Sequence, residues 1–191
     1  MPPPHNLEWR RAERGRLVAA RLAIPEAARA AADAAIFAKL IARFPPGGLP
    51  IVAGYWPMRG EFDPLPYLGR VVEAGRQVAL PVAVQPRTPL EFRLWTPGAP
   101  MAAGLWNIPY PRDGAAVTPS MLLIPLVGFD AAGHRLGNGG GFYDRTLATL
   151  APRPIAVGVG YELGRLADIA PADHDQPMDV IVTEAGAIQR Q

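Results

Sequence analysis

The chain has 191 residues, of which 49% are hydrophobic and 19% are charged, and its formal net charge is +2. This length and apolar content suit one domain with a sizeable core. The absence of cysteine excludes disulfides and thiolate metal sites. No apolar run reaches the roughly 18 residues of a membrane helix, and the first residues lack the apolar core of a signal peptide. We therefore expect a soluble cytoplasmic protein without a membrane or nucleic-acid partner, since the net charge is small and no nucleic-acid motif is present.

The first part of the chain predicts two helices and a strand. Residues 6–22 predict a basic N-terminal helix with a thin apolar face, and its five arginines are Arg10, Arg11, Arg14, Arg16 and Arg21. Pro25 suits the first turn of a second helix over residues 26–43. The apolar run 49–56 predicts a buried strand.

The remainder alternates between the two kinds of element. Helical spacing is found over 63–75 and again over 143–151, after a glycine-rich turn. Residues 96–119 are rich in proline and glycine and predict mostly loop. The other apolar runs predict strands over 77–84, 90–95, 121–129, 155–161 and 179–184. This alternation predicts an α/β fold with a mainly parallel sheet flanked by helices.

The segment GHRLGNGGGFYDR, residues 133–145, has four glycines within five residues and lies between a predicted strand and a predicted helix. Ligands gather at the carboxyl ends of strands in open α/β sheets, and a helix start offers unpaired N–H groups to an anion. Glycine lets the main chain approach a phosphate closely, and Arg135 and Arg145 can add charge. The segment lacks the Gly-Lys-Ser/Thr of a Walker loop and the glycine spacing of dinucleotide folds. It predicts a phosphate-binding loop, with a glycine turn that binds nothing as the simpler alternative.

Asp144 directly follows the aromatic pair Phe142 and Tyr143. A carboxylate beside bound phosphates commonly holds Mg²⁺. The alternative is an exposed aspartate in the first turn of a helix, which the helix dipole favours. With three histidines and no cysteine, a zinc site is not expected.

Phe129-Asp130, Gly133 and the run from Arg135 to Asp144 together resemble the hallmark of the 5-formyltetrahydrofolate cyclo-ligase family, also called methenyltetrahydrofolate synthetases. That hallmark is Phe-Asp, a Gly, then Arg-Leu-Gly-x-Gly-x-Gly-Tyr/Phe-Tyr-Asp. The similarity extends over most of the chain, through WRRAERGRL, YWPMRGEFDPLPYLGRVVEAGRQVALPV and HDQPMDVIVTE. It implies a single three-layer α/β domain over residues 1–191, and we expect a monomer.

The resemblance implies an enzyme that needs ATP and Mg²⁺ and acts on a reduced folate. The formyl oxygen of 5-formyltetrahydrofolate would attack the γ-phosphate, and the folate N10 would then close onto the activated carbon as phosphate leaves. The products would be 5,10-methenyltetrahydrofolate, ADP and phosphate. Such phosphoryl transfer depends on positioning and on charge neutralisation.

Carried over by position, the resemblance implies four groups of site residues. Those expected to bind ATP are Asn6, Arg10, Arg14, Arg135, Leu136, Gly137, Asn138, Gly139, Gly140, Gly141, Phe142 and Tyr143. Those expected to meet the folate are Trp56, Glu61, Tyr110, Phe142 and Tyr143. Asp144 and Asp175 would hold Mg²⁺, and Arg135 and Asp144 would act in catalysis. The simpler alternatives are a solvated turn for Glu61, a core position for Trp56 and a solvated face for some of the arginines.

Three positions depart from the family pattern. Asn6 stands where many members have a nucleotide-contacting lysine, Tyr110 where they often have a glutamate, and Gly164 where they often have a glutamine. Loss of a carboxylate and an amide would reshape a folate pocket. A second hypothesis therefore stays open, in which the chain is a diverged paralogue without cyclo-ligase activity. It would act on another phosphate-bearing or heterocyclic substrate, as in thiamine salvage.

Overall fold

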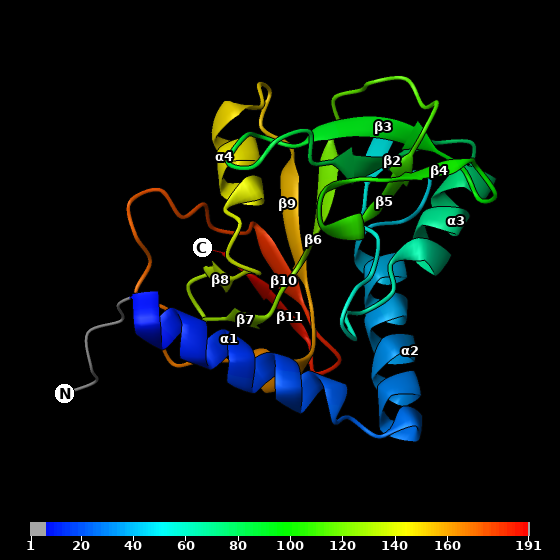
Figure 1. Ribbon diagram of the computed structural model, residues 1–191. Coiled ribbons are helices and arrows are strands. Elements are labelled where there is room, and N and C mark those ends of the chain that lie inside the picture. Colours follow the sequence, from blue (N-terminus) through cyan, green and yellow to red (C-terminus); the bar gives the residue numbers. More distant parts are fainter. Residues whose placement is uncertain (1–6, 191) are drawn as a thin grey trace.

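A seven-stranded sheet in the order β11-β10-β9-β6-β1-β2-β3 forms the centre of the protein (Figure 1). The computed structural model describes residues 7–190. The sheet strands are β1 (Ile51–Ala53), β2 (Gln77–Val82), β3 (Glu91–Trp95), β6 (Met121–Pro125), β9 (Ile155–Val159), β10 (Val180–Val182) and β11 (Ala187–Gln189). The inner strands pair in parallel, whereas the edge strands β3 and β11 run antiparallel to their neighbours. The prediction of a mainly parallel sheet is confirmed.

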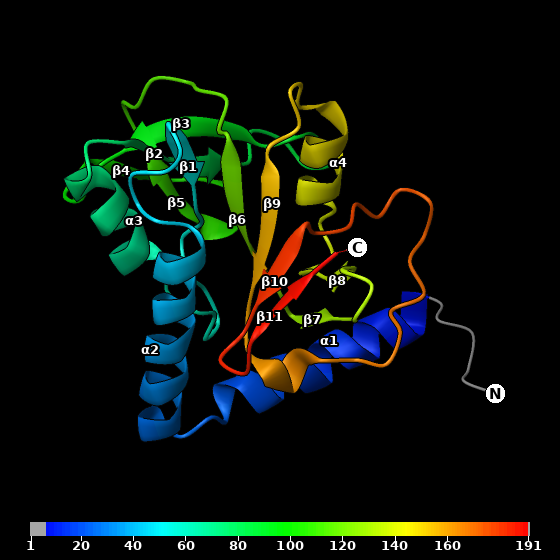
Figure 2. The ribbon, with the colours of Figure 1, turned by 180° about the vertical axis from the view of Figure 1, so that it is seen from behind.

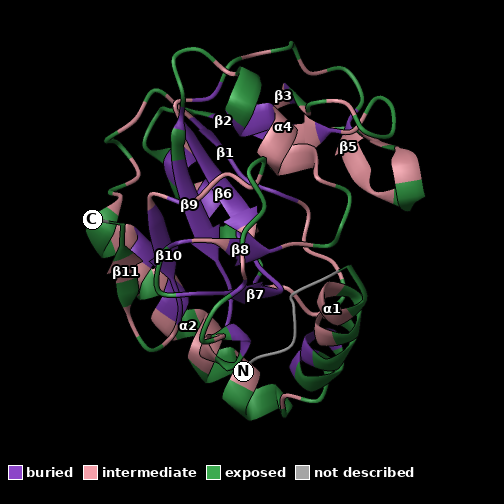
Figure 3. Ribbon diagram, turned by 90° about the vertical axis from the view of Figure 1, so that its left-hand side faces the viewer, coloured by how far each residue is buried: buried purple, intermediate pink, exposed green. Residues whose placement is uncertain are grey.

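Helices cover both faces of this sheet, which gives three layers (Figures 1 and 2). On one face, α2 (Glu26–Arg43) and α3 (Leu65–Glu73) bury Leu40 and Leu68 against the strands. On the other face, α4 (Phe142–Thr149) buries Leu147. The inner strands β6, β9 and β10 are almost wholly buried, whereas the edge strand β11 is largely exposed (Figure 3). None of the helices within residues 7–190 is both long and apolar enough to cross a lipid bilayer.

The N-terminal helix α1 (Leu7–Leu22) lies apart from these layers, across the ribbon formed by β7 (Gly128–Phe129) and β8 (Arg135–Leu136) (Figure 1). Leu17 and Val18 of α1 form a small separate core with Val127 and Leu136. Of the two leucines that form the thin apolar face in the sequence, Leu17 is buried, whereas Leu22 is 56% exposed and the prediction is wrong there. The burial of Leu17 and Val18 fixes α1 against the segment that leads into the glycine loop.

The structure differs from the predicted elements at three places. The predicted strand 121–129 ends at Pro125, because proline has no N–H to continue the ladder, and the chain then turns into β7. The segment 96–119 contains a ribbon of β4 (Met101–Ala103) and β5 (Pro109–Pro111) around a 3-10 turn, η1 (Leu105–Asn107). Strand β11 has no counterpart in the predicted elements, since three residues carry too little pattern to be recognised.

The strand order sets the place of the functional site. From β1 the chain moves outward to β2 and β3, but β6 and β9 lie on the other side of β1. Loops that leave β1 and β6 at their carboxyl ends therefore start side by side and lead away in opposite directions. Such a reversal opens a crevice where α/β proteins bind ligands. It brings residues 54–64 next to residues 126–141.

Gly164 ends a 3-10 turn, η2 (Glu162–Gly164), in a buried position. A Cβ atom there would lie 2.8 Å from the carbonyl oxygen of Val127, so even an alanine must displace main chain. Glycine at position 164 therefore allows close packing against the segment 127–128.

We expect Gly164→Ala to lower the free energy of unfolding by about 1–3 kcal/mol through overpacking. Gly69→Ala, in α3, is the matched control, because nothing lies within 4 Å of the added Cβ. It should raise stability by about 0.5–1 kcal/mol, since alanine loses less backbone entropy than glycine in a helix. Urea unfolding of both variants checks this, and equal effects of the two substitutions would contradict it.

Candidate functional site

The guanidinium of Arg135, in β8, lies beneath the glycine loop. A Cβ atom on Gly137 would come within 2.6 Å of Nη1 of Arg135, so glycine lets the loop close over this side chain. Nη2 lies 3.0 Å from Oδ1 of Asp144, yet its N–H groups are not aligned with that oxygen. Both Nε and Nη2 are buried, and neither has a hydrogen-bond acceptor among residues 7–190. Buried cationic donors that lack acceptors are costly by themselves and suit an anion. This is the observation that best fits a phosphate ligand.

The loop leads directly into α4. Gly141 adopts the left-handed conformation (φ 64°) that turns the chain into the helix, and Arg145 donates back to the carbonyl oxygen of Gly140 at 2.8 Å. The N–H groups at the start of α4 therefore follow the loop immediately, with Asp144 in the first turn. The partly buried ring of Tyr143 lies 5.7 Å from the guanidinium carbon of Arg135.

Two arginines of α1, one helical turn apart, reach the same region. Nε of Arg14 donates to the carbonyl oxygen of Gly137 at 2.8 Å, and Nη2 of Arg10 donates to Oδ2 of Asp175 at 2.7 Å. Burial, together with the charge of Arg10, lowers the pKa of Arg14 from its ordinary value. Beside them is a hollow of about 340 Å³, lined by Arg11, Arg14, Gly15, Val18, Arg59 and Asn138. This crowding of positive charge also favours an anion.

The two predicted metal ligands, Asp144 and Asp175, both lie at the segment 175–176. Oδ1 of Asp144 accepts a hydrogen bond from the main-chain N–H of Gln176 at 3.1 Å, and Gln176 adjoins Asp175. The side chain of Asp144 is 13% exposed, and within residues 7–190 its Oδ2 accepts no hydrogen bond. Burial alone would raise the pKa of Asp175, but hydrogen bonds from Arg10 and the main chain of Ala172 hold it below its usual value.

The donor set limits what metal this region can hold. Within the described chain, no group of three or more His, Asp or Glu residues is placed to hold an ion. Mg²⁺ commonly binds through one or two carboxylates, waters and substrate phosphates, so Asp144 fits such a site. Asp175 is already paired with Arg10, and its role as a ligand stays a prediction.

Glu61, in the turn after β1, faces the glycine loop from the other side of the crevice. Its side chain is only 5% exposed, so the alternative of a solvated turn residue is wrong. Oε2 accepts from the main-chain N–H of Met58 at 3.0 Å, and Oε1 accepts from Nδ2 of Asn138 at 3.2 Å. Burial raises the pKa of Glu61, while these hydrogen bonds oppose the rise. A buried carboxylate with a raised pKa in a crevice is typical of functional sites.

Arg21 was identified in the sequence analysis only as one of the basic residues of the first helix and was given no role in the site. It is 4% exposed and holds the turn that carries Glu61, because Nε donates to the carbonyl oxygen of Arg59 at 3.1 Å and Nη1 to that of Leu126 at 3.2 Å. Its Nη2 lies 3.9 Å from Oε1 of Glu61. The signal was its position one helical turn after Leu17, on the apolar face of α1.

Trp106 is the second residue that the sequence analysis missed. It lies in η1 with a left-handed backbone (φ 53°), is 61% exposed, and meets the ring of Phe142 edge to face at 5.5 Å. A strained backbone that presents a large exposed aromatic ring beside the glycine loop suggests a ligand contact. The only signal in the sequence was a tryptophan within a loop rich in proline and glycine.

The other predicted site residues lie farther from this cluster or outside the described chain. Trp56 is partly buried and packs against the core beneath α2 and α3, which supports its alternative as a core residue. The ring of Tyr110, in β5, lies 5.4 Å from the guanidinium of Arg93. Asn6 lies outside the described residues. Contacts of Trp56 and Tyr110 with a substrate stay predictions.

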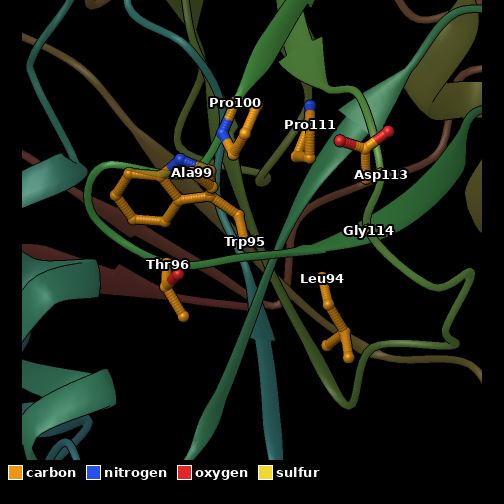
Figure 4. A pocket seen from close by; sticks show the side chains of 8 residues that line it. All are labelled: Leu94, Trp95, Thr96, Ala99, Pro100, Pro111, Asp113 and Gly114. Atoms are coloured by element: carbon orange, nitrogen blue, oxygen red, sulfur yellow. The ribbon is translucent and has the colours of Figure 1, made fainter.

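A second hollow, of about 250 Å³, opens between β3 and the β4–β5 ribbon (Figure 4). It is lined by Leu94, Trp95, Thr96, Ala99, Pro100, Pro111, Asp113 and Gly114. Asp113 is its one charged side chain, and none of the predicted site residues reaches it. Because it lacks convergent polar groups, we place the site at the glycine loop instead.

The ion pair between Arg10 and Asp175 makes stability depend on pH. Since the folded pKa of Asp175 lies below the value of about 3.9 in an unfolded chain, its contribution is complete above that value and is lost as pH falls through the folded pKa. We expect Asp175→Asn to be about 1–3 kcal/mol less stable than the native chain at pH 7, and this difference to shrink below about pH 4. Urea unfolding across pH measures it.

The control for that experiment is Asp113→Asn, because the side chain of Asp113 is 66% exposed. Its substitution should change stability little at any pH. A deficit in Asp175→Asn that stays constant from pH 7 to pH 3 would show that the charge of Asp175 is not what matters.

Comparisons with known proteins agree with this geometry. Residues 6–184 match the model of the 5-formyltetrahydrofolate cyclo-ligase family. The 5-formyltetrahydrofolate cyclo-ligases of Mycolicibacterium smegmatis and Escherichia coli K12 are both 33% identical over 140 residues, covering 69% of this chain and 72% and 76% of theirs.

Solved structures share the fold. The 5,10-methenyltetrahydrofolate synthetase of Aquifex aeolicus superposes with a TM-score of 0.81 at 26% identity, over 94% of this chain and 92% of that one. That of Mycoplasma pneumoniae superposes with a TM-score of 0.76 at 23% identity, over 92% and 98%, and shows the likeness of fold alone. The chain belongs to the 5-formyltetrahydrofolate cyclo-ligase family of enzymes.

Proposed function

We propose that this enzyme converts 5-formyltetrahydrofolate into 5,10-methenyltetrahydrofolate and consumes one ATP, which leaves as ADP and phosphate. The observation that carries the proposal is the guanidinium of Arg135, which is buried beneath the glycine loop with two nitrogens that lack acceptors. Family membership supports the substrate, and the position of the loop at the strand-order reversal supports a ligand there. We further propose that residues 1–191 act as one unit, in a cytoplasmic monomer.

The phosphates of ATP would bind between the glycine loop and α1. Arg135 would donate its unpaired N–H groups to them, and Arg10 and Arg14 would exchange their present oxygen acceptors for phosphate oxygens. Asp144 would hold Mg²⁺, which when bound neutralises phosphate charge. Fixed donors in a crevice stabilise charge at little reorganisation cost, which is the main contribution a protein makes to phosphoryl transfer.

The folate would bind on the Glu61 side of the crevice. The buried carboxylate of Glu61 would accept hydrogen bonds from N–H groups of the pterin, which fixes the ring. Burial and the nearby charge of Glu61 raise the pKa of Tyr143, so its phenol stays protonated and serves as a donor. Positioning of the formyl oxygen against the γ-phosphorus follows from binding both substrates across one crevice.

The chemistry balances in two steps. The formyl oxygen forms a bond to the γ-phosphorus as the bond to ADP breaks. The lone pair of N10 then attacks the formyl carbon, N10 loses its proton, and the former formyl oxygen leaves with phosphate. The test is direct: purified enzyme, 5-formyltetrahydrofolate and MgATP should produce the near-ultraviolet absorbance of the methenyl product. Turnover without ATP, or none beside a working control enzyme, would favour the diverged-paralogue hypothesis.

Asp144→Asn should reduce kcat about 100-fold or more while leaving the fold intact, because a neutral amide holds Mg²⁺ beside the phosphates much more weakly than a carboxylate does. Asp113→Asn, exposed and outside the site, should retain the native rate. The absorbance assay gives the rates, and circular dichroism confirms folding. A native rate in Asp144→Asn would remove Asp144 from the metal site.

Trp106→Ala should weaken substrate binding with little loss of stability, because the side chain is 61% exposed and its main partner is Phe142. An aromatic contact of this kind is worth about 0.5–1.5 kcal/mol, so we expect KM for one substrate to rise roughly 3- to 10-fold. Trp106→Phe should keep much of the affinity. Unchanged KM values for both substrates in Trp106→Ala would exclude Trp106 from the site.

A further inference from the structure

The side chain of Asn138 stands between the two halves of the site. Asn138 is exposed in the middle of the glycine loop, and it lines the hollow that Arg11, Arg14 and Arg59 surround. Its Nδ2 also donates to Oε1 of Glu61 at 3.2 Å. One side chain therefore borders both the region suited to phosphate and the buried carboxylate suited to the organic substrate.

The carboxylate of Glu61 is accessible only if something moves. It is 5% exposed, with Oε2 bound to the main chain of Met58 and Oε1 bound to Asn138. Arg21, which lies on its far side, is buried and anchored to two carbonyl oxygens. Arg21 is anchored to main-chain carbonyls, and the bond from Met58 lies within the turn that carries Glu61 itself, whereas Asn138 is carried by the exposed glycine loop. Movement of Asn138 is therefore the change that can expose the carboxylate of Glu61.

A hydrogen bond from Arg14 holds the glycine loop, and a phosphate group would compete with the loop for this arginine. Nε of Arg14 donates to the carbonyl oxygen of Gly137, the residue before Asn138, and Gly139 on the other side has a left-handed φ of 95°. A hydrogen bond from a guanidinium to phosphate is stronger than one to a neutral carbonyl. Phosphate that recruits Arg14 therefore frees the carbonyl of Gly137 and loosens the segment that carries Asn138.

We propose that Asn138 is a positioning residue that couples the two substrate sites. Its amide covers the carboxylate of Glu61 until a phosphate ligand binds Arg14 and loosens the glycine loop. Glu61 then accepts hydrogen bonds from the organic substrate. This inference rests on the proposed function. It makes nucleotide binding strengthen folate binding, and by linkage folate strengthens nucleotide binding by the same factor. The proposal assigns to Asn138 a role distinct from contact with phosphate.

The test measures binding without turnover. Calorimetry gives the Kd of 5-formyltetrahydrofolate with and without adenylyl imidodiphosphate and Mg²⁺. For the native chain we expect the Kd to fall at least about 5-fold when the nucleotide analogue is present. In Asn138→Ala, the Kd without nucleotide should already approach the lower value, and the nucleotide should change it less than 2-fold, because the cover has been removed. Gln85→Ala, in an exposed loop outside the site, should retain the native factor.

Each possible result either supports or overturns the inference that Asn138 couples the two substrate sites. Asn138→Ala that keeps the native coupling factor, or that weakens folate binding without nucleotide, overturns the inference, since Asn138 would then be irrelevant or a direct substrate contact. A native chain that binds both ligands independently overturns the inference and leaves the proposed function standing. A native chain that binds the nucleotide but not the folate overturns both. Thermal melting of Asn138→Ala should match the native chain, which separates lost coupling from lost fold.

Discussion

The rest of this site depends on one buried guanidinium, that of Arg135, which has too few hydrogen-bond acceptors. Nε and Nη2 of Arg135 have no hydrogen-bond partner in the described part of the chain, and leaving buried donors unpaired costs about 1–3 kcal/mol or more for a charged group. The fold tolerates this cost because Asp144 lies 3.0 Å away and the Tyr143 ring faces the charge. An anion bound against the guanidinium would satisfy the donors, so part of the folding stability that they cost would be recovered as binding affinity. Such local compromise is usual where a protein binds or reacts.

The glycines beside Arg135 have different physical duties. A side chain at Gly137 would displace the guanidinium of Arg135, because Nη1 lies 2.6 Å from the place where a Cβ would stand. Gly141 must turn the chain through a left-handed conformation so that α4 starts next to the loop. The spacing of glycines along the motif thus reflects where arginine side chains run beneath it and where the helix begins. This is why the pattern is more specific than a count of glycines.

Helices and the glycine loop were readable from the sequence because each has a strong local cause. The predicted helix 26–43 coincides with α2, and the expected fold class is confirmed. The contacts across the crevice were not readable, since Arg21 and Asn138 meet Glu61 over separations of 40 and 77 residues along the chain. The ribbon β4–β5 and its exposed Trp106 lay in a segment whose prolines and glycines predict only loop. Local sequence patterns predict the helices and strands, whereas the site is formed by contacts between side chains of different helices, strands and loops.

The N-terminal helix shows how these pairings bear on function. Three of its arginines each bind a different segment: Arg10 binds Asp175, Arg14 binds the glycine loop and Arg21 binds the turn before Glu61. The first two are the partly exposed ones that the family pattern assigns to ATP, and they already have oxygen acceptors. Under the proposed function, their contribution to nucleotide affinity would be the difference between a phosphate and a protein oxygen as acceptor, and each exchange would release a segment of the protein. Arg21 has no such freedom, because it is buried and its removal would free the turn that carries Glu61. The same helix would thus supply two exchangeable contacts and one fixed support, through which a ligand at the loop would affect the other side of the crevice without a change of fold.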